Sequence, residues 1–334
     1  MRVLATLSVV LAVCCAPAWA EEKVETVIEG LTNPCGIAVQ PETGDLFVSD
    51  SGAGRIIRVQ IDEGGKATQS DVITGFTKDI YGKGPMYDIG PLGLVFLDKN
   101  TLIVGGGDKV DVEEVIYVFE VPEPGAAAIT VNDAKAKLGP LAKTDEIQAE
   151  GNYYALAIAG GAVFATANGD DTKGWIVKAT IDGTKFGELE RSIATKEAVN
   201  VDAPVALTTD DKGNLVVGQM GEINVPNDSL LSFYSPKTGK LKLNLETGLF
   251  DITALAYSPK GHLYATDFAW MAPEEGGLFR LDAEGKGQEQ TINAVKIVSL
   301  DKPTAMAFGK DGSLYITLIG SEGKGKLVRL APGL

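Results

Sequence analysis

The chain repeats one pattern of hydrophobic and polar positions six times. Each copy has a short apolar segment, a polar turn and a second apolar segment, as in Pro34-Cys-Gly-Ile-Ala-Val followed by Gly44-Asp-Leu-Phe-Val-Ser. A third segment, such as Arg55-Ile-Ile-Arg-Val, and a more polar fourth, such as Ser70-Asp-Val-Ile-Thr, complete the unit. Successive units are separated by 57, 62, 51, 48 and 51 residues, because they begin at Pro34, Pro91, Tyr153, Pro204, Ile252 and Pro303.

Four strands at this period predict an all-β fold, a single six-bladed β-propeller of four-stranded antiparallel blades. The first two segments are almost continuously apolar, as expected for strands buried on both faces. The last unit lacks a fourth segment after Leu330, whereas an unassigned strand pattern, residues 22–29, precedes Pro34. We expect this N-terminal strand to join the last blade and close the ring, because an open ring leaves an unpaired edge. A β-sandwich with accidental internal similarity is the alternative.

The connections differ between the two faces of such a propeller. The turns between the first and second strands are short and rich in Gly, Asp and Asn, and we call the face that carries them the plain face. The opposite, loop-rich face carries long, irregular loops. Binding residues concentrate on variable loops of a rigid scaffold. The candidate ligand-binding residues on the loop-rich face are therefore Tyr81, Tyr87, Met220, Phe268, Trp270 and Met271. The alternative is that these side chains only pack the loops down.

The first twenty residues have the features of a secretory signal peptide. Arg2 precedes an apolar run of about ten residues, and Ala18-Trp-Ala fits the small-residue cleavage rule. We therefore divide the chain into a signal peptide, residues 1–20, and a propeller, residues 21–334, that is secreted or periplasmic. A lipoprotein anchor at Cys14 is less favoured because Val13 is bulky. No later stretch is long and apolar enough to cross a membrane.

Composition narrows the classes of function. The sequence has 45 acidic and 30 basic residues, a net charge of −15, which argues against a nucleic-acid binder. His262, the single histidine, falls in a predicted turn on the plain face, so catalysis by a Ser-His-Asp triad is disfavoured. Cys35 alone remains after removal of the signal peptide, and one cysteine forms no internal disulfide. We expect a monomer.

The first unit resembles an NHL repeat. Its Pro34-Cys-Gly-Ile-Ala-Val strand, its Val48-Ser-Asp strand end and its Arg55-Ile strand correspond to the motifs of that family, and the match is looser in the other units. The NHL-type propellers are related in fold to the TolB-like and regucalcin/gluconolactonase-like propellers. NHL propellers are mostly binding modules, and the resemblance implies the same role here.

The regucalcin/gluconolactonase group hydrolyses lactones with calcium, which Glu, Asn and Asp hold at the start of the innermost strands. The matching positions here hold no carboxylate or amide, since they are Cys35, Leu92, Tyr154, Val205, Thr253 and Thr304. A second set of oxygen ligands lies one or two residues before these strands begin, namely Asn33, Asn152, Asp202, Asp251 and Asp301. These five are candidate calcium ligands. The alternative is that Asn and Asp suit the turns that enter the strands.

The function expected from the sequence is binding of a small molecule or a protein partner at the loop-rich face of an exported NHL-type propeller. The alternative is a calcium-dependent lactonase or esterase of the gluconolactonase type. No cofactor is firmly implied, and calcium is the candidate. Quinone-dependent sugar oxidation is disfavoured because it relies on a histidine base.

Overall fold

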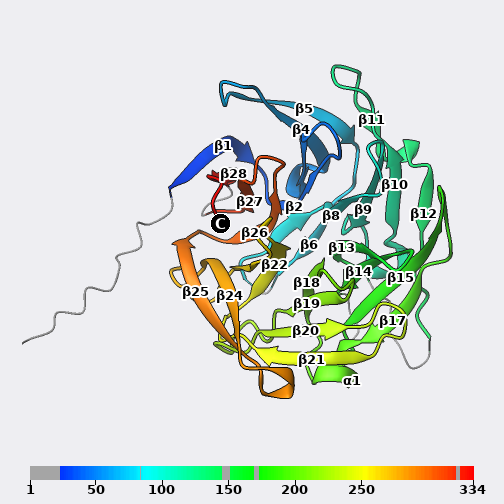
Figure 1. Ribbon diagram of the computed structural model, residues 1–334. Helices are drawn as coiled ribbons and strands as arrows, with labels where there is room; N and C mark the ends of the chain where they lie inside the picture. Colours follow the sequence, from blue (N-terminus) through cyan, green and yellow to red (C-terminus); the bar gives the residue numbers. More distant parts are fainter. Residues whose placement is uncertain (1–22, 83, 145–150, 169–172, 321–323) are drawn as a thin grey trace, which may run out of the picture.

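Six blades surround a central channel in the computed structural model, which describes residues 23–82, 84–144, 151–168, 173–320 and 324–334 (Figure 1). The predicted signal peptide and Cys14 lie outside the described residues. The sheets confirm an all-β, six-bladed propeller with very little helix. Each blade runs outward from its first strand, which lines the channel.

The first three blades depart from the regular four-stranded plan: blades 1 and 3 have an additional short strand, and blade 2 has a short outer strand. Blade 1 contains β2 (Pro34–Val39), β3 (Leu46–Asp50), β4 (Arg55–Ile61) and β5 (Ala67–Thr74), and β11 (Ile129–Thr130) pairs with β5 in parallel. Blade 2 contains β8 (Pro91–Phe96), β9 (Thr101–Gly106), β10 (Ile116–Glu120) and β12 (Ala136–Leu138). Blade 3 contains β13 (Tyr153–Ala159), β14 (Ala162–Ala167), β15 (Trp175–Asp182) and β17 (Glu190–Ala194), and β16 (Lys185–Phe186) also pairs with β15.

The last three blades keep the four-stranded plan. Blade 4 contains β18 (Pro204–Thr209), β19 (Leu215–Gln219), β20 (Leu230–Tyr234) and β21 (Leu241–Glu246). Blade 5 contains β22 (Ile252–Tyr257), β23 (Leu263–Asp267), β24 (Gly277–Glu284) and β25 (Thr291–Ser299). Blade 6 contains β26 (Pro303–Phe308), β27 (Leu314–Leu318), β28 (Gly325–Leu330) and the N-terminal strand β1 (Val24–Leu31).

The ring closes through β1, as the sequence predicts. This strand pairs antiparallel with β28, from Val24 opposite Leu330 to Leu31 opposite Gly325. In Figure 1, β1 at the start of the chain lies directly beside β28 near its end. The last blade therefore contains strands from both ends of the described chain, and no blade edge is left open at the junction between blades 6 and 1.

A β-bulge recurs in the innermost strand of every blade. The pairing of β2 with β3 passes from Pro34–Asp50 to Gly36–Ser49, so Cys35 is an extra residue on the inner strand. The same shift occurs next to the second residue of the other five inner strands. A bulge re-aims a side chain that regular pairing would place elsewhere. The residues at this position are Cys35, Leu92, Tyr154, Val205, Thr253 and Thr304.

Small residues let neighbouring blades approach closely around the channel. The next-to-last residue of each second strand is small, namely Ser49, Gly105, Thr166, Gly218, Thr266 and Thr317. Ser49 Oγ donates to the Leu92 carbonyl of the next blade at 2.6 Å, and Thr166 Oγ1 donates to the Val205 carbonyl at 3.0 Å. At Gly105, an added Cβ would lie 1.9 Å from the Tyr153 carbonyl oxygen, so the close approach requires glycine there.

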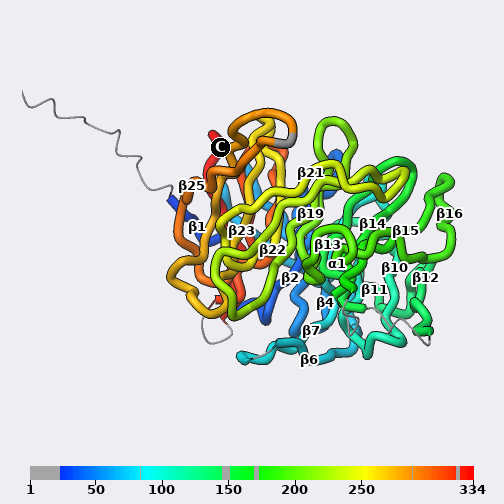
Figure 2. The backbone as a smooth tube through the Cα atoms, turned by 90° about the horizontal axis from the view of Figure 1, so that it is seen from below, coloured from blue at the N-terminus to red at the C-terminus, as the bar shows by residue number. Residues whose placement is uncertain are grey.

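A two-stranded hairpin projects from the connection between blades 1 and 2. It consists of β6 (Asp79–Tyr81) and β7 (Tyr87–Ile89). Figure 2 places it on the face opposite the C-terminal residues, which is the loop-rich face. The sequence predicts an irregular loop here, whereas the structure shows paired strands.

Helical turns are short and lie in the connections. They are α1 (Thr195–Val199) and the 3-10 turns η1 (Ser51–Ala53), η2 (Asp111–Glu113), η3 (Val131–Asp133) and η4 (Gly287–Glu289). Within the described ranges, no helix has the length and apolar character needed to cross a membrane.

The junction that closes the ring makes a testable prediction. Thr304 Oγ1 donates to the Pro34 carbonyl at 2.6 Å, from blade 6 to blade 1, and the side chain is buried. Thr304→Val leaves that carbonyl without its donor, so we expect a loss of about 1–3 kcal/mol in the free energy of unfolding. Urea denaturation measures it. Thr291→Val, at an exposed position of β25, is the matched control and should change stability by less than about 0.5 kcal/mol. Equal effects of the two substitutions would contradict this account of the junction.

Candidate functional site

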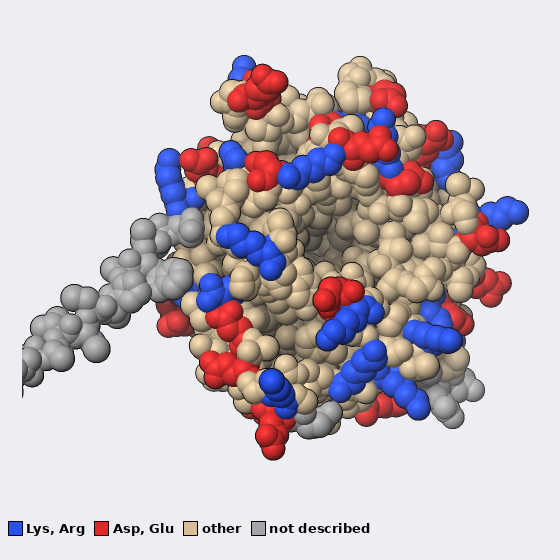
Figure 3. All heavy atoms as spheres, in the orientation of Figure 1, with Lys and Arg blue, Asp and Glu red and all other residues tan. Residues whose placement is uncertain are grey.

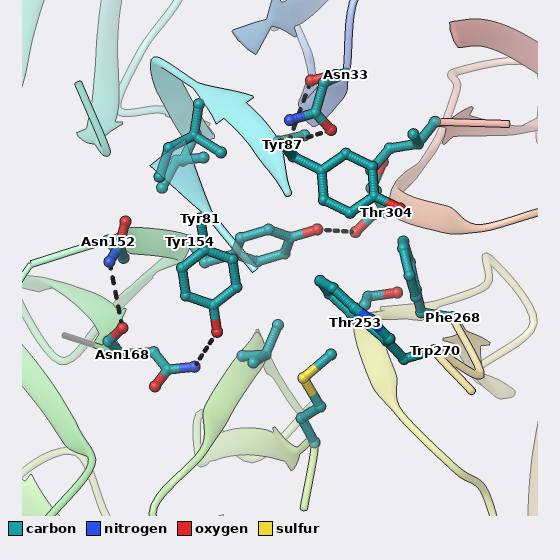
Figure 4. Close-up of a pocket in the computed structure, with 16 residues that line it drawn as sticks. Asn33, Tyr81, Tyr87, Asn152, Tyr154, Asn168, Thr253, Phe268, Trp270 and Thr304 are labelled. Atoms are coloured by element: carbon teal, nitrogen blue, oxygen red, sulfur yellow. Dashed lines mark hydrogen bonds between the residues drawn. The ribbon is translucent and has the colours of Figure 1, made fainter. Parts of the chain in front are cut away.

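A chamber of about 70 Å³ occupies the loop-rich end of the central channel. Sixteen residues line it, and Figure 4 shows them converging from all sides of the ring. The six bulged residues of the inner strands form its floor. Because the bulge repeats in every blade, one side chain from each blade reaches the axis. The remaining wall residues come from the loops and from the β6–β7 hairpin.

Aromatic rings form the roof of the chamber. The hairpin supplies Tyr81 and Tyr87, and the loop after β23 supplies Phe268 and Trp270. The Tyr87 ring meets the Trp270 ring edge-on, with 5.6 Å between the ring centroids, and the Phe268 ring at 6.5 Å. Trp270 Nε1 donates to the Gly84 carbonyl in the hairpin loop at 3.0 Å. Blade 5 therefore holds the hairpin over the channel.

Three asparagines form part of the side wall. Asn33 Nδ2 donates to the Asp88 carbonyl at 2.7 Å, and Asn168 Nδ2 donates to the Tyr81 hydroxyl at 3.3 Å. Asn33 and Asn152 have positive φ angles of 49° and 51°, a backbone conformation that asparagine tolerates better than most residues. The turns entering β2 and β13 therefore place amide groups at the chamber.

Tyr154 separates the chamber from the other half of the channel. Its hydroxyl crosses to blade 6 and donates to the Thr304 carbonyl at 2.9 Å. Cys35, Tyr154, Thr253 and Thr304 also line a second cavity, of about 210 Å³, on the plain-face side. Figure 3 shows the ring hollowed at its centre, with uncharged residues around most of the hollow. The channel is therefore divided at the level of the bulged residues.

The described part of the chamber wall carries no formal charge. None of the described residues that line it is Asp, Glu, Lys, Arg or His. Burial raises the pKa of the Cys35 thiol to about 12, so this cysteine stays protonated and unreactive at neutral pH. Burial also holds the pKa of the Tyr154 hydroxyl well above its ordinary value, with smaller contributions from Cys35 and Tyr81. The described wall residues therefore offer hydrogen bonds and ring faces, and they include no acid or base that works near neutral pH.

Two polar atoms in the wall have no hydrogen-bond partner among the described residues. The Tyr87 hydroxyl and the Asn152 Oδ1 are buried and make no hydrogen bond to any described residue. Leaving such a group unpaired costs about 1–3 kcal/mol, so native proteins seldom do so without a ligand or water. Both atoms belong to chamber residues, which indicates that the chamber takes a ligand with complementary polar groups.

Two buried carboxyl groups support the wall from behind. Asp251 Oδ2 accepts the Trp270 backbone N–H at 2.5 Å, and Glu114 accepts the Asn152 backbone N–H. Burial raises the pKa of Asp251 to about 7, helped by the charges of Asp267 and Asp228. Burial raises the pKa of Glu114 to about 9, helped by Asp111 and Asp108. Each carboxyl positions a residue of the chamber, and neither belongs to its surface.

Five of the six predicted ligand-binding residues meet in this one wall: Tyr81, Tyr87, Met220, Phe268 and Trp270. Met271 does not, since it is 66% exposed beside the roof. Sequence reasoning missed Asn168, Ile89 and Ile319, which also line the chamber. The alternation around residues 79–89 could have revealed the hairpin and hence Ile89. Single residues after a strand, such as Asn168 and Ile319, carry no such signal.

The predicted calcium ligands divide into two groups. Asn33 and Asn152 line the chamber. The other three lie elsewhere: Asp202 pairs with Lys196 at 3.3 Å, Asp251 lies behind Trp270, and Asp301 is exposed. Over the part of the chain that the structure describes, no three His, Cys, Asp or Glu side chains gather as a metal site would require. A calcium site built from these five residues stays a prediction.

Comparisons with known proteins show the fold. No protein-family model matches the sequence, and no curated protein matches it significantly. Among solved structures, the PQQ-bound aldose sugar dehydrogenase from Streptomyces coelicolor has a TM-score of 0.63 and 16% identity, covering 93% of this chain and 98% of that chain. A putative gluconolactonase has a TM-score of 0.58 and 13% identity, covering 93% of each chain. A luciferin-regenerating enzyme has a TM-score of 0.60 and 12% identity, covering 94% and 96%.

The described wall does not fit PQQ, and it offers calcium only amide and hydroxyl oxygens. Calcium takes six to eight oxygens, largely from carboxylates, and no carboxylate is among the described wall residues. PQQ carries carboxylate groups, and burying them requires Lys or Arg partners, which the described wall also lacks. His262 lies in the turn before β23, at the far end of that strand from Asp267 and the chamber loop.

The two supporting carboxyl groups predict distinct pH profiles. Between the pKa of an Asp in the unfolded chain and its higher pKa in the folded protein, the folded protein keeps the proton and the unfolded chain has lost it. The free energy of unfolding therefore falls as pH rises through this range. Asp251→Asn has no proton to lose, so its free energy of unfolding should not show this fall. The difference between the variant and the unmodified protein should therefore rise by roughly 1–3 kcal/mol between about pH 4 and pH 7 and then level off.

Glu114→Gln is the internal comparison for that experiment. Its relative stability should go on rising to about pH 9, because the pKa of Glu114 is higher than that of Asp251. Urea denaturation at a series of pH values measures both profiles. Profiles parallel to that of the unmodified protein would show that neither carboxyl is buried in its protonated form.

Proposed function

We propose that this protein binds an uncharged, largely apolar small molecule in the chamber beneath the β6–β7 hairpin. The observation that carries the proposal is the wall itself, which combines five aromatic rings with no charged residue among those described. Apolar pockets with a few placed polar groups are the usual form of small-molecule sites. An ionic ligand would be buried without a counter-charge, which costs several kcal/mol.

Binding without catalysis suits the chemistry of the wall. Hydrolysis requires an activated nucleophile or an activated water, and the chamber thiol is held protonated by burial. We infer an NHL-type role in the broad sense, a rigid propeller that presents a ligand site on its loop-rich face. Export through the predicted signal peptide belongs to the same proposal and would place the site outside the cytoplasm.

A ring-sized ligand requires the chamber to widen. Its volume of about 70 Å³ is smaller than that of an engineered apolar cavity of about 150 Å³ that binds benzene. The hairpin is joined to the opposite rim by the Trp270–Gly84 hydrogen bond and by contacts between rings. Asn33 and Asn168 also donate hydrogen bonds to the hairpin, at the Asp88 carbonyl and the Tyr81 hydroxyl. An outward movement of β6 and β7 that breaks these contacts is the simplest route into the chamber.

Three probes of similar size test this function. Isothermal titration calorimetry should detect binding of toluene and phenol at neutral pH, and benzoate should bind at least tenfold more weakly because it is anionic. Val205→Phe, which fills the floor, should abolish binding of the neutral probes. Val225→Phe introduces the same ring at a position 44% exposed on the same face and should leave binding intact. No binding of either neutral probe, or equal binding of benzoate, would contradict the proposal.

The calcium-dependent hydrolase remains the second candidate. It is favoured by Asn33 and Asn152 at the chamber and by the buried Asp251 Oδ1, which has no partner among the described residues. This alternative predicts that millimolar calcium raises the melting temperature and that Asp251→Ala removes the effect. A melting temperature that does not respond to calcium would rule it out.

A further inference from the structure

We propose that the chamber selects an aromatic ligand that carries a hydroxyl group, and that the Tyr87 hydroxyl is the hydrogen-bond partner of that group. The inference rests on the proposed function and names the chemical class of its ligand. It depends on a polar atom that the protein leaves unpaired and on the ring contacts that keep this atom in place.

The fixed position of Tyr87 is the first step. Its ring lies edge-on to both Phe268 and Trp270, and the Lys302 ammonium lies 6.0 Å from the ring centroid on one face. Tyr87 is the first residue of β7, and this strand is paired with β6 so that Tyr87 lies opposite Tyr81. With these neighbours around the ring, the hydroxyl cannot turn away to bulk water without opening the roof.

The second step is the contrast among the tyrosines of the chamber. The Tyr154 hydroxyl donates to the Thr304 carbonyl at 2.9 Å, and the Tyr81 hydroxyl accepts from Asn168 at 3.3 Å. The Tyr87 hydroxyl is buried and has no partner in the described chain. A phenylalanine would fill the same space without that cost, so the hydroxyl has a use that the ligand-free protein does not reveal.

The third step defines the ligand. A tyrosine hydroxyl both donates and accepts, whereas the unpaired Asn152 Oδ1 only accepts. A hydroxyl group on the ligand can satisfy either atom, because it also donates and accepts. The aromatic roof favours a flat ring beside that group, through stacked or edge-on contacts. A phenol-like molecule meets all of these conditions and stays uncharged at neutral pH.

Tyr87→Phe tests the inference through a ratio of affinities. Calorimetry on the unmodified protein should give phenol about three- to tenfold higher affinity than toluene, although water hydrates phenol more strongly. In Tyr87→Phe the ratio should fall to about one or below. Tyr315→Phe, a buried tyrosine on β27 outside the chamber, is the matched control and should keep the original ratio.

Thermal stability supplies an independent readout of the same hydroxyl. Tyr87→Phe should raise the melting temperature of the ligand-free protein, because it removes an unpaired buried group. Tyr154→Phe should lower it, because it breaks the hydrogen bond to Thr304. If Tyr87 had only a structural role, its substitution would lower the melting temperature and leave the phenol-to-toluene ratio unchanged.

The results of these experiments distinguish a failure of this inference from a failure of the proposed function. Failure of both neutral probes to bind would overturn the proposed function itself. Binding of both probes with equal affinity, or a preference for phenol that survives Tyr87→Phe, would overturn only the assignment of the hydroxyl-bearing ligand to Tyr87. Loss of the preference in Tyr87→Phe, with the preference kept in Tyr315→Phe, would support it.

Discussion

The structure depends on one repeated distortion, the β-bulge in the innermost strand of each blade. Regular pairing would alternate the side chains of these strands between the two faces of the blade. The extra residue instead brings six side chains to the axis, from Cys35 in blade 1 to Thr304 in blade 6. Close packing around those bulges explains the small residues of the second strands, since a Cβ at Gly105 would collide with the Tyr153 carbonyl. At the same close contacts, the hydroxyls of Ser49 and Thr166 donate hydrogen bonds to backbone carbonyls of the next blade.

The chamber follows from this arrangement and from one irregular connection. The bulged residues divide the channel and provide a floor, and the β6–β7 hairpin provides a roof that Trp270 holds in place. Among the described residues, the carboxyl groups of Asp251 and Glu114 support the wall from behind, where they accept backbone N–H groups. The scaffold shares its fold with sugar dehydrogenase and gluconolactonase neighbours, and the described residues of its chamber wall carry no charge that PQQ would need, nor a carboxylate for calcium. The fold is therefore compatible with many chemistries, and the wall residues decide among them.

Much of this architecture could be predicted from the sequence, because the inner strands repeat their pattern in phase. The six blades, the closure by β1 and the convergence of Tyr87, Phe268 and Trp270 on one face all follow from that phase. The bulges could not be predicted, since Cys35 and Thr304 share no residue type that marks them. The partners of individual side chains were equally hidden. Asp251 and Asp301 look alike at the ends of their loops, yet one is 1% exposed behind Trp270 and the other lies at the surface.

The central claim is that an uncharged aromatic ligand binds within the chamber, beneath the hairpin and above the bulged residues. A crystal structure of the protein soaked with phenol tests it most directly. The account predicts density for the ring against Tyr87 and Trp270, with the phenol oxygen within hydrogen-bond distance of the Tyr87 hydroxyl, and an outward shift of β6 and β7. An unchanged chamber at a saturating concentration of phenol, or phenol bound only outside it, would contradict the account.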